Sequence, residues 1–193
     1  TSTMPASDSK PLTASGNSGV ATIATGITSL TATGFTVGSD NMANRAATPY
    51  VWVAFKAAAG ELQAGSYTGS AVDNRSIPGV GFSPDMVMAF AEGAYKPVFT
   101  TSTMTADQSY DFYSGGQFTD MIQALESDGF QVGLNQNVNL NGMRYHYVAW
   151  NAVPGRMAVG SYTGNGLDNR AIDAVGFRPE WVIVRRNLNN SMA

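Results

Sequence analysis

The residues with the clearest chemical potential in this sequence form a short motif that occurs twice. Asp73-Asn74-Arg75 recurs 95 residues later as Asp168-Asn169-Arg170, and each copy follows a tyrosine, Tyr67 or Tyr162. Carboxylate and carboxamide oxygens are ligands that Ca²⁺ prefers, and the same polar groups beside an aromatic ring could clamp a sugar. The candidate ligand-binding residues are therefore Tyr67, Asp73, Arg75, Tyr162, Asp168 and Arg170.

The motif also has a structural interpretation. An Asp can start a turn by accepting hydrogen bonds from backbone amides two residues on. An Arg can pair with a nearby acid while its stem covers apolar surface. Apart from the motif, the two copies share an ionisable charge at only one further place, Asp85 and Glu180. We favour the structural interpretation and expect no cofactor or metal other than calcium bound at the motif.

Catalytic residues are harder to find in this sequence. The single histidine, His146, aligns with Val51 in the first copy, and no repeated Ser, Asp or Cys accompanies it. A residue that can be Val in an equivalent strand is more typical of a packed position than of a general base. Asp107 and Asp111 form a carboxylate pair that occurs in one copy alone. We therefore expect no catalytic residues and a protein that is not an enzyme.

These motifs belong to an internal repeat. A shift of 95 positions aligns residues 27–98 with 122–193 without a gap, and 26 of the 72 pairs are identical. Thr1-Ser2-Thr3-Met4 recurs at an offset of 100 as Thr101-Ser102-Thr103-Met104. Such a repeat is typical of one supersecondary unit used twice. We expect a first β-module at 1–97 and a second at 98–193, or, in another phase, a complete module at 65–159 flanked by two partial copies.

The elements that position the motifs are predicted to be β-strands. Tyr50–Phe55 and Tyr145–Trp150 are β-branched and aromatic stretches that are apolar on both faces, which is typical of buried strands. Five further stretches, each bounded by turn residues, give the same prediction: Leu62–Thr68, Met86–Ala91, Val98–Thr103, Met157–Thr163 and Trp181–Val184. Residues 119–127 alone suggest a helical turn, because Ile122 and Leu125 are three apart. The predicted fold is all-β, with β-sandwich or jelly-roll-like modules in tandem duplication.

The motifs also resemble a known kind of module. The string G-S-Y-T-G-x-x-x-D-N-R-x-I-x-x-V-G-F-x-P-x-x-V, which begins at Gly65 and again at Gly160, is similar to a module of bacterial surface proteins and of phage tail or virion proteins. That module is often strung in tandem and has no agreed activity, so no catalytic residue can be carried over. The resemblance implies display outside the cell, on the cell surface or on a virion.

Composition narrows the classes of partner. The net charge is −3, so no basic field favours nucleic acid. No apolar run is long enough to span a bilayer. Only 13% of residues are charged and the chain has no cysteine, which leaves a surface rich in hydroxyl and amide groups, so stability must come from packing.

The phase of the repeat leads to the functional prediction. In the second phase, the flanking partial copies either complete each other within one chain or pair head-to-tail between chains by strand complementation. We expect a non-enzymatic structural subunit of an extracellular or virion assembly, such as a filament, tail or surface layer, whose partners are copies of itself. The alternative is a carbohydrate-binding or adhesive module that meets a surface glycan through the loops and through Trp52, Phe55, Tyr147, Trp150 and Trp181.

Overall fold

Antiparallel strands carry almost all of the regular structure in the computed structural model, which describes residues 1–5, 8–12, 14–15, 18–112 and 117–186. The first part of the chain holds β1 (Ala14–Ser15), β2 (Ser18–Gly19), β3 (Ile27–Leu30), β4 (Phe35–Val37) and the one-turn helix α1 (Asn41–Asn44). The middle holds β5 (Leu62–Thr68), β6 (Arg75–Pro78), β7 (Met86–Ala91), β8 (Val98–Thr101), β9 (Ser109–Asp111), β10 (Gln117–Phe118), β11 (Ile122–Glu126), β12 (Gly129–Val132), α2 (Gln136–Asn139) and β13 (Arg144–Trp150).

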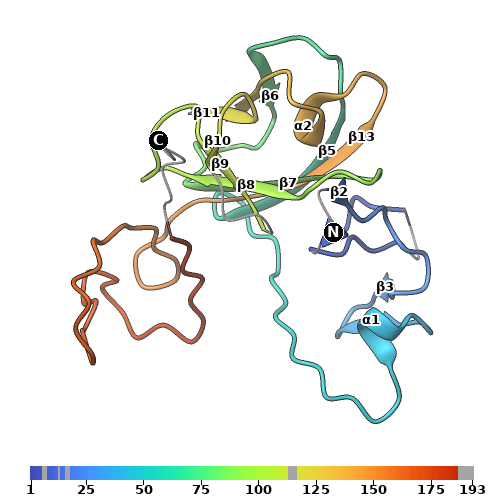
Figure 1. Ribbon diagram of the computed structural model, residues 1–193, viewed down its shortest axis with the longest axis horizontal. Coiled ribbons are helices and arrows are strands. Elements are labelled where there is room, and N and C mark those ends of the chain that lie inside the picture. The colour runs from blue at the N-terminus through green and yellow to red at the C-terminus, as the bar shows by residue number, and fades with distance from the viewer. Residues whose placement is uncertain (6–7, 13, 16–17, 113–116, 187–193) are drawn as a thin grey trace.

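The middle of the chain, residues 62–150, forms a two-layer β-sandwich. One layer is a six-stranded antiparallel sheet in the order β10-β9-β8-β7-β13-β5, and the other is a three-stranded sheet in the order β11-β12-β6. In Figure 1 the three-stranded sheet and α2 lie above the six-stranded sheet. The predicted all-β, sandwich-type fold is confirmed.

Strand β13 lies near the middle of the six-stranded sheet because it has neighbours on both sides. Tyr145 lies opposite Tyr67 of β5 and opposite Ala91 of β7, and the pairing continues without a shift to Trp150. The side chains of Tyr145, Tyr147 and Ala149 enter the core that the two sheets share. His146, on the other face, is also buried. These two covered faces account for the continuous apolar run in the sequence.

The core between the sheets is built around four aromatic rings. Tyr67 stacks on Tyr145 with a centroid distance of 5.2 Å and an interplanar angle of 14°. Phe130 of β12 meets Tyr147 edge to face at 5.1 Å and Tyr67 at 6.1 Å. Phe130 and Tyr145 are fully buried. Because offset-stacked and edge-to-face pairs add to the energy of area burial, this cluster fixes how the three-stranded sheet sits on the larger one.

The helical turn predicted for residues 119–127 is wrong, because the segment forms strand β11. Ile122 pairs with Val132, but Ala124 pairs with Gln131, so a bulge inserts one extra residue, Gln123. The bulge returns Leu125 to the core-facing side, where Ile122 also lies. A spacing of three, typical of one helical face, here comes from a bulged strand.

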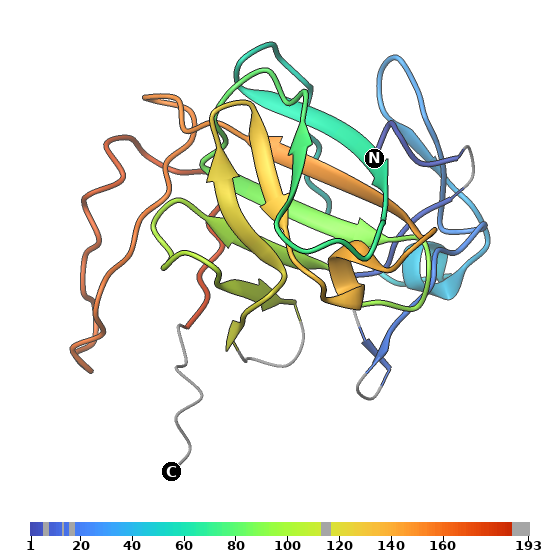
Figure 2. The same ribbon diagram turned by 90° about the horizontal axis from the view of Figure 1, so that it is seen from above.

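Two arms extend from the sandwich, the N-terminal arm (residues 1–61) and the C-terminal arm (residues 151–186). In Figures 1 and 2 the arms lie on opposite sides of the sandwich, the N-terminal arm in blue to cyan and the C-terminal arm in orange to red. The buried strands predicted at Tyr50–Phe55, Met157–Thr163 and Trp181–Val184 are wrong: these segments are largely exposed and belong to no strand. A segment with two apolar faces forms a buried strand only where neighbouring strands pair with its backbone.

The aromatic cluster yields a prediction about stability. Phe130→Ala should lower the free energy of unfolding by about 3–5 kcal/mol, because a fully buried ring leaves a cavity. Phe35→Ala, at the equivalent position of the N-terminal arm, should cost much less, because Phe35 is only half-buried. Denaturant unfolding followed by tryptophan fluorescence compares the two variants. Equal losses would contradict a core centred on Phe130.

Candidate functional site

The first copy of the repeated motif is folded into the sandwich. Asp73 Oδ1 accepts hydrogen bonds from the backbone N of Asn74 at 2.8 Å and from Gln123 Nε2 at 3.1 Å. Arg75 donates from one guanidinium nitrogen to the carbonyl of Thr68 at 2.5 Å, and its guanidinium carbon lies 5.8 Å from the Tyr67 ring centre. The predicted pairing of Arg75 with an acid is wrong, since its side chain bonds a carbonyl instead. The turn is therefore closed by contacts within the protein.

Tyr67 is part of the core and is not a surface ligand in this copy. Its hydroxyl donates to the carbonyl of Val138 at 2.8 Å, and its side chain is buried. Burial raises the pKa of Tyr67 well above its usual value of 10, and the neighbouring Tyr145 adds to the shift. Asn74 has a φ of 54°, in the left-handed region that Asn tolerates better than most residues. This copy of the motif shapes a turn against the core.

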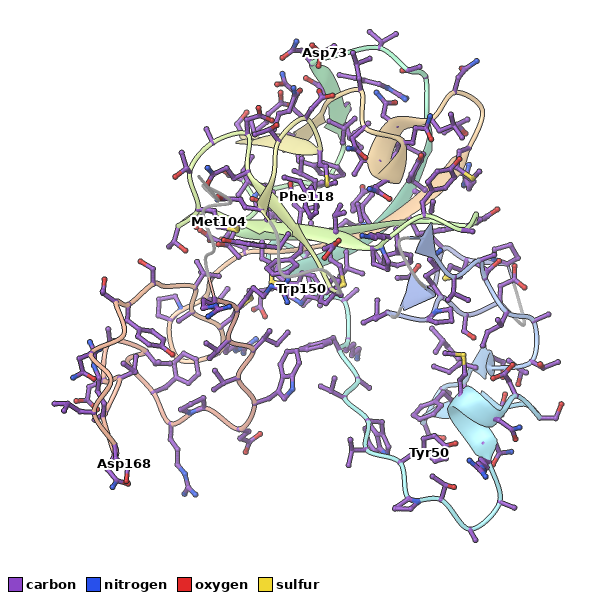
Figure 3. The ribbon with its side chains drawn as sticks, in the orientation of Figure 1. Tyr50, Asp73, Met104, Phe118, Trp150 and Asp168 are labelled. Atoms are coloured by element: carbon purple, nitrogen blue, oxygen red, sulfur yellow. The ribbon has the colours of Figure 1, made fainter. Side chains whose placement is uncertain are left out.

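The second copy of the motif has the same local geometry without the cover. Arg170 donates to the carbonyl of Thr163, its guanidinium carbon lies 5.6 Å from the Tyr162 ring centre, and Asp168 Oδ1 accepts from the backbone N of Asn169. Tyr162 is 50% exposed, against 7% for Tyr67. Figure 3 places Asp73 and Asp168 far apart, so the two copies of the motif do not form one site.

A hollow of about 250 Å³ lies beside Tyr162 in the C-terminal arm. Its lining residues are Tyr162, Gly164, Asn165, Gly166, Leu167, Arg170 and Ile172. The lining thus combines an exposed aromatic ring, a guanidinium group and the backbone groups of a glycine-containing loop. Of the six predicted ligand-binding residues, Tyr162 and Arg170 line this hollow.

Asn139 is a polar residue that organises the sandwich, although no motif in the sequence singled it out. It is fully buried at the end of α2. Its Nδ2 donates to the carbonyls of Val72 and Gly133, each at 2.8 Å, and its Oδ1 accepts from the backbone N of Ser70 at 2.9 Å. A buried carboxamide that is satisfied in this way ties two loops together. The signal was present, because Asn44 is the identical residue 95 positions earlier.

His146 is a packed residue that also anchors the N-terminal arm. Thr3 Oγ1 lies 2.9 Å from Nδ1 of His146, and Glu92 Oε1 lies 2.9 Å from Nε2. Lys10 Nζ adds a second tie by donating to the carbonyl of Gly93 at 2.6 Å. A hydroxyl, an imidazole and a carboxylate in this order could relay a proton. None of the three side chains, however, lines the hollow beside Tyr162 or a larger hollow that is lined by Lys96 and Asp111. Thr3 stood out in the sequence only as part of the repeated Thr1-Ser2-Thr3-Met4 string, and no sequence signal pointed to Glu92.

A larger hollow, of about 490 Å³, lies where β2, β9, β10 and α2 meet. Lys96 Nζ lies 3.1 Å from Asp111 Oδ2 within its lining, and the Asp111 side chain is fully buried. Lys96 also lies 5.9 Å from the ring centre of Phe118. Its backbone N donates to Asn137 Oδ1 at 2.8 Å. These contacts bind the segment between β7 and β8 to α2.

Within the described ranges, no three His, Asp or Glu side chains gather closely enough to hold a metal ion. In the same part of the chain, no helix has the length and apolar character needed to cross a membrane.

Comparison with protein-family models, with curated proteins and with solved structures finds no significant match for this chain.

The buried histidine yields a prediction about pH. Burial lowers the pKa of His146 from its usual 6.5, although the hydrogen bond to Glu92 partly opposes the shift. The unfolded chain therefore takes up a proton more readily than the folded chain, so stability is full above about pH 6.5 and falls as the pH drops below it. For one proton the fall is at most about 1.4 kcal/mol per pH unit.

The measurement is the free energy of unfolding between about pH 7 and pH 5, where His is the side chain that ordinarily titrates. His146→Val, which copies the residue at position 51, is the control and should remove the slope. Parallel loss of stability in both proteins would assign the slope to other groups.

Proposed function

We propose that this chain is a non-enzymatic structural subunit of an extracellular or virion assembly, such as a filament, tail or surface layer, built from repeated β-modules. Its partners are copies of itself. The observation that carries the proposal is the concentration of unpaired apolar segments in the two arms.

The distribution of exposed apolar side chains separates the arms from the sandwich. Of the nineteen large apolar side chains that the described residues expose, ten lie in the N-terminal arm, seven in the C-terminal arm and two in the sandwich. Val51 is 100% exposed, Trp52 73% and Trp181 54%. Some of these side chains are consecutive in the chain, at Tyr50–Val53 and Trp181–Val184. Clusters of exposed apolar side chains typically mark an interaction site. The arms therefore have the character of surfaces that associate.

Open strand edges also favour association. In the sandwich, β12 pairs with β11 on one side and with β6 on the other. In the N-terminal arm, the equivalent strand β4 pairs, among the residues that the structure describes, with β3 alone. An unpaired edge offers a row of N–H and C=O groups that another strand can bond. The low charge of the chain and its resemblance to modules of surface and virion proteins support the proposed location.

A carbohydrate-binding or adhesive module is the second candidate. The hollow beside Tyr162 supports it, because an exposed tyrosine ring and the Arg170 guanidinium could stack on and hydrogen-bond a sugar. In this function the chain acts without forming a polymer, and the C-terminal copy of the motif is the binding site.

Self-assembly is the prediction that tests the first candidate. The purified chain should form regular fibres or rings in negative-stain electron microscopy. Its mean mass by light scattering should rise over a hundredfold range of concentration, as expected for mass-action association. A uniform monomer over the whole range would contradict the proposal.

Glycan binding tests the second candidate. A screen of surface glycans should then give binding that Arg170→Ala abolishes. Arg75→Ala is the matched control, because the Arg75 side chain is bound to Thr68 and stacked on a buried ring. Equal loss in both variants would indicate general unfolding.

A further inference from the structure

The hollow beside Tyr162 has a counterpart in the sandwich that is filled by protein. In the sandwich, the end of α2 occupies the equivalent space. Tyr67 Oη donates to the carbonyl of Val138, Ser70 N donates to Asn139 Oδ1, and Ala71 N donates to the carbonyl of Asn139 at 3.0 Å. The space in the sandwich is therefore filled by a one-turn helix that ends in an asparagine.

The N-terminal arm carries such a helix, α1, already folded. Asn44 aligns with Asn139, and its Nδ2 donates to the carbonyl of Gly38 at 2.7 Å, as that of Asn139 donates to Gly133. Tyr50 Oη donates to Asn41 O at 2.8 Å and accepts from Arg45 N at 2.9 Å. Tyr145 makes the same two bonds, with Gln136 O and Leu140 N. Asn44 is exposed, whereas Asn139 is buried.

The aromatic side chains near α1 are arranged like those of the sandwich. Phe35 meets Trp52 edge to face at 5.9 Å and 76°, as Phe130 meets Tyr147 at 5.1 Å and 74°. Tyr50, Trp52 and Phe35 of the N-terminal arm thus correspond to Tyr145, Tyr147 and Phe130 of the sandwich. The fourth ring of the sandwich cluster, Tyr67, has its counterpart in the C-terminal arm, at Tyr162.

Two glycines in the C-terminal arm give independent support. A Cβ on Gly65 would lie 2.1 Å from the Tyr147 ring, and one on Gly69 would lie 2.1 Å from the carbonyl oxygen of Leu140. Their counterparts Gly160 and Gly164 have nothing within 4 Å of that position. The sandwich requires glycine at both places because a strand and α2 approach closely. In the arm the same two glycines leave space for an equivalent approach.

We propose that the hollow of the C-terminal arm binds α1 and the segment Tyr50–Phe55 of a second copy of this chain, a contact that rests on the proposed function and specifies it. The register of this contact follows from the pairing of β13 in the sandwich, because the repeat offset is 95 residues. Each residue of β13 is replaced by the residue 95 positions earlier, and each residue of β5 and β7 by the residue 95 positions later. Val51 lies opposite Ser161, as His146 lies opposite Ser66. Val53 lies opposite Ile183, as Val148 lies opposite Met88. Phe55 and Trp181, which hold the positions of Trp150 and Met86, already meet within one chain, so the second copy supplies the pairs from Tyr50 to Ala54.

The arrangement of the arms favours a second copy over the same chain. The two arms lie on opposite sides of the sandwich in Figures 1 and 2, and Asp168 and Tyr50 lie to the left and to the right in the lower half of Figure 3. At their base, Asn151 N donates to Glu61 O at 2.8 Å and Phe55 meets Trp181 at 5.9 Å. Each copy then carries the helix α1 on one surface and the hollow that binds it on another. The contact is therefore heterologous and propagates head-to-tail.

The absence of cysteine allows a clean cross-linking test. Val51→Cys and Ser161→Cys are made in separate chains, mixed, and treated with a thiol cross-linker short enough to join directly opposite residues, whose Cβ atoms are about 4.5–5.5 Å apart. The proposal expects dimers that contain one chain of each kind. Ala54→Cys in place of Val51→Cys is the register control and should cross-link far less with Ser161→Cys, since its side chain points to the other face.

A second variant separates pairing from unspecific contact. Gly164→Val on the Ser161→Cys chain should reduce the cross-linked fraction about tenfold, since overpacking typically costs 1–3 kcal/mol. Since nothing lies within 4 Å of a Cβ at position 164, the substitution should leave the free energy of unfolding of the sandwich unchanged. Undiminished cross-linking in this variant would overturn the proposal.

The remaining outcomes distinguish this contact from the assembly in general. A cross-link that forms only within a chain carrying both cysteines would show that the arms close on themselves, and it overturns pairing with a second copy. Fibres without the Val51–Ser161 cross-link would leave the structural function standing and overturn this contact. Mixed dimers that cross-link but form no larger assembly by light scattering would support this contact and overturn the proposed filament.

Discussion

The sandwich depends on the placement of β13 between β5 and β7. Both edges of this strand are paired, so its backbone groups are satisfied within the sheet. With the strand held on both sides, Tyr145 and Tyr147 project together toward the second layer. There they meet Tyr67 and Phe130. The three-stranded sheet is positioned by these rings, and α2 is tied to the same strand through the Tyr145 hydroxyl.

The two arms repeat the sequence pattern of β13, β5 and β7, but their segments are not placed beside one another as those strands are. Residues 50–55 align with β13, and residues 157–163 and 181–186 align with β5 and β7. Within the part of the chain that the structure describes, no strand pairs with either side of residues 50–55, and none lies between the two C-terminal segments. Local structure survives where it depends on contacts within a few residues, as in the bonds of Tyr50 to Asn41 and Arg45. Burial is lost, because it requires the missing neighbours. This difference connects the fold to the proposed association.

The repeated motif illustrates how one set of residues serves two surroundings. Beside the sandwich core, Tyr67 and Arg75 close a turn and α2 covers it. In the C-terminal arm, Tyr162 and Arg170 keep the same mutual geometry around a hollow. The turn is therefore a local property, whereas access to it is a tertiary property. Polar residues that bridge distant segments, such as Asn139 and His146, belong wholly to the second category.

Local sequence patterns were enough to predict the all-β class, the strands at 62–68 and 86–91, the strand around 145–150 and the turn character of the Asp-Asn-Arg motif. Each of these follows from local propensity and from the period of apolar residues. Long-range contacts, in contrast, leave residues 50–55 exposed, make β11 a bulged strand and let Asn139 bridge two loops. Those features depend on which segments meet across large distances in sequence, and a periodicity that spans a few residues carries no information about such meetings.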